Sequence, residues 1–349
     1  MIEADMIPAG CSSLPVGSHC PKQFSIIVPV HNGAETIGLC LSALANQEFP
    51  RNCFEIIVVN DGSTDGTSTI ARQFPVKVID LPRNEGRLVA RQVGAKQASH
   101  EILVFNDVRV IPEPSLLRKL SERDYFPLMP DVVDYDGSRM GYSRLFYLLR
   151  RKIYYPNYPL SGGSGEIFID RSNFDKMPKG TTNLACPKSV WLAYQPERLG
   201  KHINDDTRIL YHIVEEHPLL RTPEIRVKYL QRTNFWGVVR HMYGRGPRFA
   251  DYYLVPGGRF YVWYLTVWAL LGFAVALLLW APSALMWAAL ASAITFVGLA
   301  AWLSERPLDL VVVLFLFPPI IFAFGLGILR GQISRWGAAL RALARVWFI

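Results

Sequence analysis

Several kinds of site are absent from this sequence of 349 residues. We find no phosphate-binding P-loop, no Gly-x-Gly-x-x-Gly turn and no Gly-x-Ser-x-Gly turn, the local signatures of P-loop nucleotidases, dinucleotide-binding proteins and α/β-hydrolases. The segment that most resembles a zinc-protease helix has His212 and His217 five residues apart. Such positions diverge by about 140° around a helix, whereas a zinc helix needs histidines four residues apart. The sequence therefore argues against a metalloprotease.

Cysteine is scarce and unpaired. The five cysteines show no Cys-x-x-Cys pair and no metal-site spacing, which predicts reduced thiols in a cytosol-facing domain. Residues 1–23 contain Glu3 and Asp5 and lack the apolar core of a signal peptide. We interpret them as a mobile leader and expect the domain that follows to stay on the cytoplasmic side.

Charged residues are almost absent from long runs after Phe260, and half of all residues in the chain are hydrophobic. Three apolar stretches, 260–281, 283–303 and 308–329, each have about the length that a helix needs to cross the hydrocarbon core. The shift in composition predicts a domain boundary near Pro256, so that residues 256–330 form a transmembrane region with two to three segments. A net charge of +8 then favours an anionic membrane face or a phosphorylated ligand over nucleic acid, for which no motif is present.

The topology of the last segments is predicted from prolines and arginines. Pro318 and Pro319 interrupt the third apolar stretch, and arginines follow it. We expect a broken or re-entrant third segment, two full crossings and a cytosolic tail. In residues 331–349, an apolar face opposite the arginines predicts a basic amphipathic helix in the membrane interface. A rougher pattern of this kind at 142–153 fits an interfacial helix or one that packs on the core.

The first part of the chain alternates between strand and helix patterns. Apolar runs at 24–30, 54–60, 76–81 and 102–105 predict strands, and helix-length segments lie at 35–47, 67–73 and 87–98. This alternation predicts an α/β fold with a mostly parallel sheet, and ligands of such sheets bind beyond the carboxyl ends of the strands.

Three motifs follow these strands in order: Val28-Pro29-x-x-Asn32, Asp61-Gly-Ser-x-Asp65 and Asn84-x-Gly86-x-x-x-Ala90-Arg91. Together they resemble the inverting family-2 glycosyltransferases of the GT-A fold, over roughly residues 24 to 250. The resemblance implies a Rossmann-like GT-A catalytic domain at 24–255.

The resemblance also implies site residues on the donor side. Asp61 would accept hydrogen bonds from the base or ribose of a nucleotide sugar, near Pro29 at the end of the first strand. Arg91 matches a position that often reaches the nucleotide, although an arginine on a helix is as often a solvated charge. Family members usually have Asp-x-Asp after the fourth strand, whose carboxylates hold a divalent cation against the pyrophosphate.

Here that motif is changed: Asp107 matches the first aspartate, and Arg109 occupies the place of the second. Asp107 can hold Mg²⁺ or Mn²⁺ with help from water and phosphate oxygens. Alternatively, Arg109 binds the leaving diphosphate itself, since a guanidinium binds phosphate through two hydrogen bonds. The third interpretation is a protein that has lost catalysis.

On the acceptor side, Asp205 and Asp206 match the acidic pair of the family, whose second member is the general base. The same residues are a signal for the start of a helix. Further along, Arg240, His241 and Tyr243 match by position a region that meets the diphosphate and the acceptor, and a juxtamembrane basic anchor explains them equally well.

The resemblance thus implies a multi-pass protein of the cytoplasmic membrane that moves a sugar from a nucleotide-sugar donor to a lipid or lipid-linked acceptor. A polyprenyl-phosphate sugar synthase is one alternative, and it needs no strong base because its nucleophile is already an anion. A catalytically silent membrane partner of a glycan pathway is the other.

Overall fold

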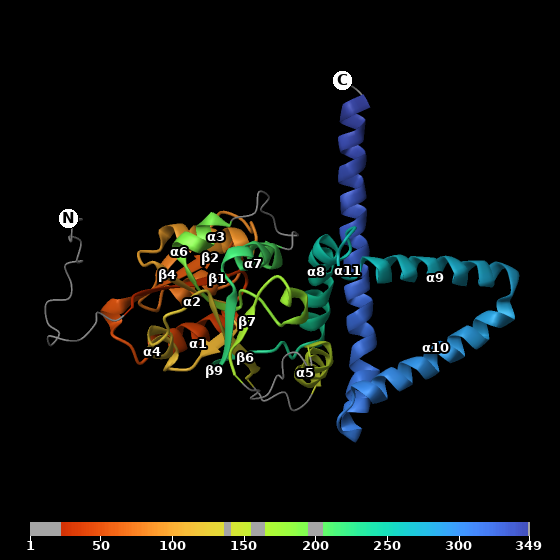
Figure 1. Cartoon of the computed structure of the whole chain (residues 1–349), viewed down its shortest axis with the longest axis horizontal. Coiled ribbons are helices and arrows are strands. Elements are labelled where there is room, and N and C mark those ends of the chain that lie inside the picture. Colours follow the sequence, from red (N-terminus) through yellow and green to blue (C-terminus); the bar gives the residue numbers. More distant parts are fainter. Residues whose placement is uncertain (1–21, 136–140, 155–164, 195–204, 348–349) are drawn as a thin grey trace.

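The computed structural model describes residues 22–135, 141–154, 165–194 and 205–347, and Figure 1 shows their arrangement. An α/β domain lies on one side, and a long helix with two further helices lies on the other. The leader predicted at 1–23 falls almost entirely outside the described residues.

The expected strands are confirmed. β1 (Phe24–Val30), β2 (Phe54–Asn60), β3 (Lys77–Asp80) and β4 (Ile102–Asn106) pair in parallel in the order β3-β2-β1-β4. The helices between them are α1 (Ala34–Ala45), α2 (Thr67–Ala71) and α3 (Arg87–Gln97), with the 3₁₀ turn η1 (Arg51–Cys53) before β2. These elements are the parallel half of a GT-A-like domain.

The other half of the sheet is mixed. The sheet continues β4-β8-β6-β9-β5, with β7 on β9, and β8 is antiparallel to both β4 and β6. Its strands are β5 (Val110–Pro112), β6 (Leu128–Asp134), β7 (Ile167–Ile169), β8 (Asn183–Pro187) and β9 (Leu219–Tyr229). Its helical elements are α4 (Leu116–Ser121), α5 (Gly141–Tyr154), η2 (Phe174–Lys176), α6 (Lys188–Ala193) and α7 (Asp205–Glu216).

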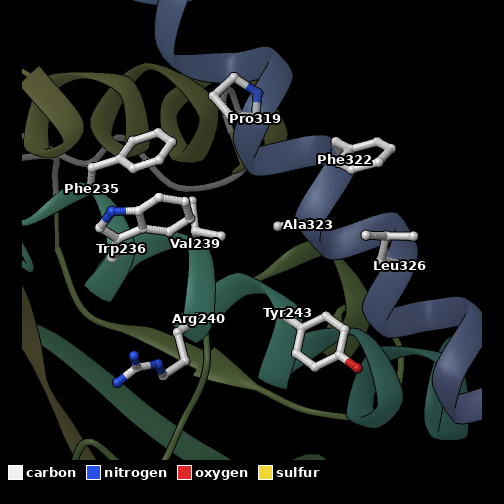
Figure 2. A pocket seen from close by; sticks show the side chains of 9 residues that line it. All are labelled: Phe235, Trp236, Val239, Arg240, Tyr243, Pro319, Phe322, Ala323 and Leu326. Carbon is white, nitrogen blue, oxygen red and sulfur yellow. The ribbon is translucent and has the colours of Figure 1, made fainter.

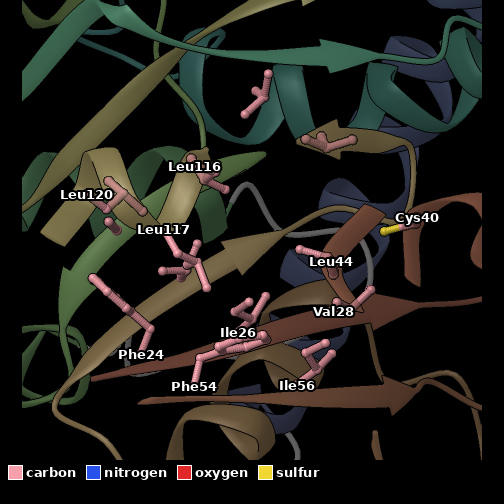
Figure 3. Packing of buried hydrophobic residues seen from close by; sticks show 14 of the residues in the cluster. Phe24, Ile26, Val28, Cys40, Leu44, Phe54, Ile56, Leu116, Leu117 and Leu120 are labelled. Carbon is pink, nitrogen blue, oxygen red and sulfur yellow. The ribbon is translucent and has the colours of Figure 1, made fainter. Parts of the chain in front are cut away.

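Alternate residues of β1 point to opposite faces of the sheet. Helices cover both of these faces. Ile26 and Val28 belong to a core with α1, α2 and α4, part of which Figure 3 shows. Ile27 belongs to a second core with α3, α6 and α7. Burial on both faces explains why β1 and β2 are continuous apolar runs. Cys40 and Cys186 are buried free thiols in these two cores, and Cys53 is a buried free thiol outside them.

The C-terminal region consists of α8 (Phe235–Tyr253), α9 (Tyr261–Trp280), α10 (Pro282–Leu303) and α11 (Pro307–Trp347). In Figure 1, α8 lies beside α11, whereas α9 leads away from it and α10 returns to its beginning. Within the described residues, Met286–Leu303 and Pro307–Gly337 are long and apolar enough to cross a membrane, and the apolar part of α9, Tyr261–Leu277, is shorter. Only 11% and 22% of the two longer windows are buried, so neither is the core helix of a soluble domain. These helices support membrane association; the number of crossings stays a prediction.

The predicted break at Pro318-Pro319 is wrong, since α11 runs through both prolines. A helix interior accepts proline when a neighbouring helix stabilises it. Ile320, one residue further, is buried in a cluster with Leu145 and Leu148 of α5 and Val238 of α8. Residues 331–347 consequently continue α11, and their place at a membrane interface stays a prediction.

Close contacts hold α8 and α5 against α11. Gly246 on α8 lies so close to Gly327 on α11 that an added Cβ would stand 2.4 Å from the Gly327 backbone. A Cβ on Gly331 would stand 2.7 Å from Pro247. On α5, buried Arg144 donates from Nε to Asp309 Oδ1 at 2.8 Å and from Nη2 to Asp309 Oδ2 at 2.7 Å. α5 therefore packs on α11, and its buried leucines cluster with residues of α8, α10 and α11 rather than with either core of the sheet. The predicted packing on the core is not confirmed, and a place at a membrane interface stays a prediction.

Candidate active site

A cavity of about 270 Å³ opens at the carboxyl ends of β1, β2 and β4. This is the edge at which parallel α/β sheets bind ligands. Pro29 lies there at the end of β1, two residues beyond Ile27, the last residue of β1 that pairs with β4. The remaining wall comes from α1, α3, the loop after β4, β9 and the loop that follows it, and α8. The lining residues that the following argument uses are Pro29, Asp61, Arg87, Asp107, Arg109, Arg232 and His241.

Asp61 borders this cavity, as predicted, and is only 3% exposed. Its two carboxylate oxygens accept hydrogen bonds from the backbone N–H groups of Glu85, at 2.7 Å, and Gly86, at 2.9 Å. Asp61 therefore holds the turn that begins α3 against the end of β2. A carboxylate oxygen has further lone pairs, so contact with a ribose or base stays compatible with this bonding.

The other motif residues tie two loops together. Asp65 Oδ2 accepts the N–H of Ala34 at 3.1 Å, and Thr67 Oγ1 accepts the N–H of Gly33 at 2.9 Å. Asn32, whose φ of 49° lies in the left-handed region, accepts the N–H of Thr64 at 2.8 Å. The N-terminus of α1 is thus capped from the loop after β2, a role for Asp65 that local sequence patterns did not reveal.

Arg91 is neither the solvated arginine nor a wall of the cavity. Its side chain is fully buried, and its Nη2 donates to Asp107 Oδ1 at 2.7 Å. Arg87, one turn earlier on α3, places Nη1 at 4.0 Å from Asp107 Oδ2. This arrangement argues against direct contact of Arg91 with a nucleotide and indicates that Arg91 positions Asp107.

Arg109 also lines the cavity, and its Nη1 donates to the carbonyl of Leu230 at 3.2 Å. Burial and the nearby Arg232 lower the pKa of the Arg109 guanidinium. Arginines stay charged even so. Like charges gathered in this way mark a cleft of positive potential suited to an anion.

His241 lies on the face of α8 that borders the cavity, close to several arginines. Burial, with Arg232, Arg245, Arg87 and Arg248 nearby, lowers its pKa well below the ordinary value of 6.5. His241 is therefore neutral at pH 7, and the positive charge of the cleft comes from arginine.

A divalent cation would find few ligands from the protein in this cavity. In the part of the chain that the structure describes, no three His, Cys, Asp or Glu side chains come together, so an ion at Asp107 would depend on water and phosphate oxygens for most of its ligands. Asp107 is compensated by Arg91 and approached by Arg87. These groups do not fit a Mg²⁺ or Mn²⁺ site made by the protein.

The acidic pair lies at the start of a helix, since α7 begins at Asp205. The side chains of Asp205 and Asp206 lie outside what the structure describes, so their catalytic role stays a prediction.

Arg240 and Tyr243 line a different hollow from His241. They border an apolar groove of about 430 Å³ between α8 and α11. Figure 2 shows Phe235, Trp236 and Val239 on one side of the groove and the side chains of α11 on the other, with Arg240 extending away from α11. The three residues predicted to meet the acceptor or diphosphate are thus divided between two faces of α8.

Part of the chain that forms this site is similar to a known protein family. Residues 25–158 match the family model described as Glycosyl transferase family 2. The chain carries a family-2 glycosyltransferase domain. The predicted family is thereby confirmed for the segment that contains β1 to β4, Asp61, Arg91, Asp107 and Arg109.

Relatives of the family-2 domain include glycosyltransferase AglE of Haloferax volcanii, 38% identical over 100 residues, which make up 27% of this chain and 33% of AglE. Poly(ribitol-phosphate) beta-N-acetylglucosaminyltransferase TarS of Staphylococcus aureus is 40% identical over 90 residues, 24% of this chain and 16% of TarS. A crystal structure of S. aureus TarS in complex with UDP-GlcNAc has a TM-score of 0.47 and 20% identity, covering 64% of this chain and 66% of that one. The chain thus spans a third or less of the curated relatives named here.

Proposed function

We propose that the chain is an inverting glycosyltransferase that moves a sugar from a nucleotide-sugar donor to a lipid or lipid-linked acceptor at the cytoplasmic face of a membrane. The observation that carries this proposal is the arginine-lined cavity at the carboxyl ends of β1, β2 and β4, which residues 25–158 of the family-2 domain form together with Tyr229, Arg232 and His241. The similarity to AglE and TarS, both glycosyltransferases, supports the reaction class.

In an inverting transfer, the acceptor oxygen attacks the anomeric carbon as the bond to the nucleoside diphosphate breaks. The acceptor loses its proton to a base, and the diphosphate leaves with the bonding electrons. Asp206 at the start of α7 is the proposed base. Asp61 borders the part of the cavity assigned to the nucleotide.

The leaving diphosphate gains negative charge during this reaction. We assign its stabilisation to Arg109, Arg87 and Arg232, which line the cavity. Fixed guanidinium groups stabilise developing charge without having to reorganise. Asp107 keeps Arg87 nearby and is itself held by Arg91. We accordingly propose that transfer proceeds without a divalent cation.

The acceptor class is inferred from the link between cavity and membrane helices. α8 carries His241 on the cavity and Gly246 against α11. A lipid acceptor that stays in the bilayer would therefore reach the cavity without leaving the membrane. The basic side chains of α5 and α8 favour the cytoplasmic side.

The test uses the full chain in lipid vesicles with a panel of nucleotide sugars and membrane lipid extract, with and without EDTA. Release of nucleoside diphosphate with one donor, unchanged in EDTA, is expected. Release abolished by EDTA would refute the arginine assignment, and no release despite donor binding would favour a silent partner. Asp206→Asn should abolish transfer; full activity in this variant would instead favour a polyprenyl-phosphate sugar synthase.

A further inference from the structure

The groove between α8 and α11 is nearly all apolar. Its volume is about 430 Å³, and its walls are Phe235, Trp236, Val239, Arg240 and Tyr243 from α8 and Pro319, Phe322, Ala323 and Leu326 from α11. Trp236 and Phe322 are each 68% exposed. Large aromatic side chains at an open groove mark a surface that another apolar body covers.

The groove has one apolar end and one charged end. The two helices run in the same direction here, because Tyr243 approaches Gly327 and Pro247 approaches Gly331. They touch at Gly246 and Gly327 and are separated by the groove toward Trp236 and Pro319. At the narrow end, the Arg330 guanidinium lies 5.4 Å from the ring centre of Tyr243.

α8 separates this groove from the arginine-lined cavity. Arg240 borders the groove, and the next residue, His241, borders the cavity. Consecutive residues point about 100° apart around a helix, so the two hollows lie on neighbouring faces of α8. A chain lying in the groove would therefore end, at Tyr243, close to the wall of the reaction site.

From this juxtaposition we propose that the α8–α11 groove binds the hydrocarbon chain of the acceptor, a lipid that carries phosphate, with its headgroup at Arg330. The proposal rests on the proposed function and adds the class of acceptor and the place of its chain. An aromatic and aliphatic groove suits a hydrocarbon chain, and a guanidinium group at its narrow end suits a phosphate. Because Pro307–Gly337 is long and apolar enough to cross a membrane, the α11 side of the groove is open to such a lipid.

The experiment is photo-crosslinking of the full chain in phosphatidylcholine vesicles. The probes are a polyprenyl phosphate and a phosphatidic acid, each with a diazirine on its hydrocarbon chain. Labelling by at least one probe is expected in peptides 235–243 and 319–326, and unlabelled lipid of the same headgroup should compete at least tenfold better than phosphatidylcholine.

Variants of exposed residues keep the test interpretable. Trp236→Ala should lower groove labelling several-fold, whereas Trp263→Ala on α9, whose side chain is 70% exposed against 68% for Trp236, should leave it unchanged. Arg330→Gln should weaken competition by phosphate-bearing lipid while chain labelling by excess probe remains.

Three outcomes would overturn the proposal: labelling spread evenly over α9, α10 and α11; equal competition by phosphatidylcholine; or crosslinks between two copies of the chain at these peptides. Nucleoside diphosphate release is measured on the same vesicles. Groove labelling without any release would count against the proposed function alone, and release from Trp236→Ala at the normal rate with every lipid would count against the groove alone.

Discussion

Arg109 offers the sharpest test of how the cavity handles charge, because it occupies the place of a metal-binding aspartate. Its guanidinium lines the cavity within a partly buried, positive environment. A hydrogen bond to a charged group contributes about 1.5–3 kcal/mol. Arg109→Ala should therefore weaken pyrophosphate binding roughly 10- to 150-fold.

The structure also limits the side effects of this change. Arg109 Nη1 donates to the Leu230 carbonyl at 3.2 Å, so the variant loses one tether between two loops. Such a bond stabilises folding by about 1 kcal/mol, which a thermal unfolding curve would show as a small shift. Arg118→Ala is the matched control, since Arg118 is half exposed and pairs with Glu122 on α4.

The assay is calorimetric titration of the reconstituted chain with pyrophosphate in EDTA, repeated with Mn²⁺. Arg109→Asp sharpens the result, because it recreates the Asp-x-Asp pattern with Asp107. We expect this variant to lose binding in EDTA and to regain part of it with Mn²⁺. Unchanged affinity in Arg109→Ala, or wild-type binding that disappears in EDTA, would refute the assignment of the diphosphate to arginine.

Three further changes test other parts of the structure. Gly62→Ala should destabilise the α/β domain by at least about 1 kcal/mol in thermal unfolding, because Gly62 has φ +63° and an added Cβ would stand 2.4 Å from the Arg83 backbone; an unshifted unfolding temperature would contradict this reason. Asp309→Asn should lower the free energy of unfolding by about 3–5 kcal/mol, since it breaks the buried ion pair with Arg144. Protease digestion of the α5 region would detect the loosened contact, and unchanged cleavage would argue that the ion pair with Glu305 is enough to hold Arg144. Because the pKa of His241 is depressed in the folded chain, the unfolded chain binds the extra proton, and stability should fall by about 1.4 kcal/mol per pH unit below pH 6.5 until the folded pKa is reached. His241→Asn should remove that slope from a pH series of unfolding curves, and an identical slope in both proteins would show that another group titrates.

The parallel half of the fold could be predicted because its signals are local. Each of β1, β2 and β4 is an apolar run that ends in turn residues, and burial on both faces produces this pattern. The mixed half could not, because its pairing joins distant segments: Asn106 on β4 lies opposite Asn183 on β8. Neither strand carries a local mark of its partner.

The candidate site was predictable to a similar extent. Asp61 and Asp107 follow strands directly, so their arrival at one edge of the sheet follows from topology. The burial of Arg91 does not follow from topology, because it depends on a hydrogen bond to Asp107 in another loop. For the same reason, residue spacing could not show that Arg240 and His241 serve different hollows.

The glycine contact between α8 and α11 has a mechanical consequence. At Gly246 and Gly327 the two backbones touch, with no layer of side chains between them. An α11 that crosses the membrane, as proposed, would tilt to match a thinner or thicker bilayer and would move α8 with it at this contact, together with the His241 wall of the cavity. We therefore expect transfer rates to change with the acyl-chain length of the vesicles even when donor and acceptor are held constant.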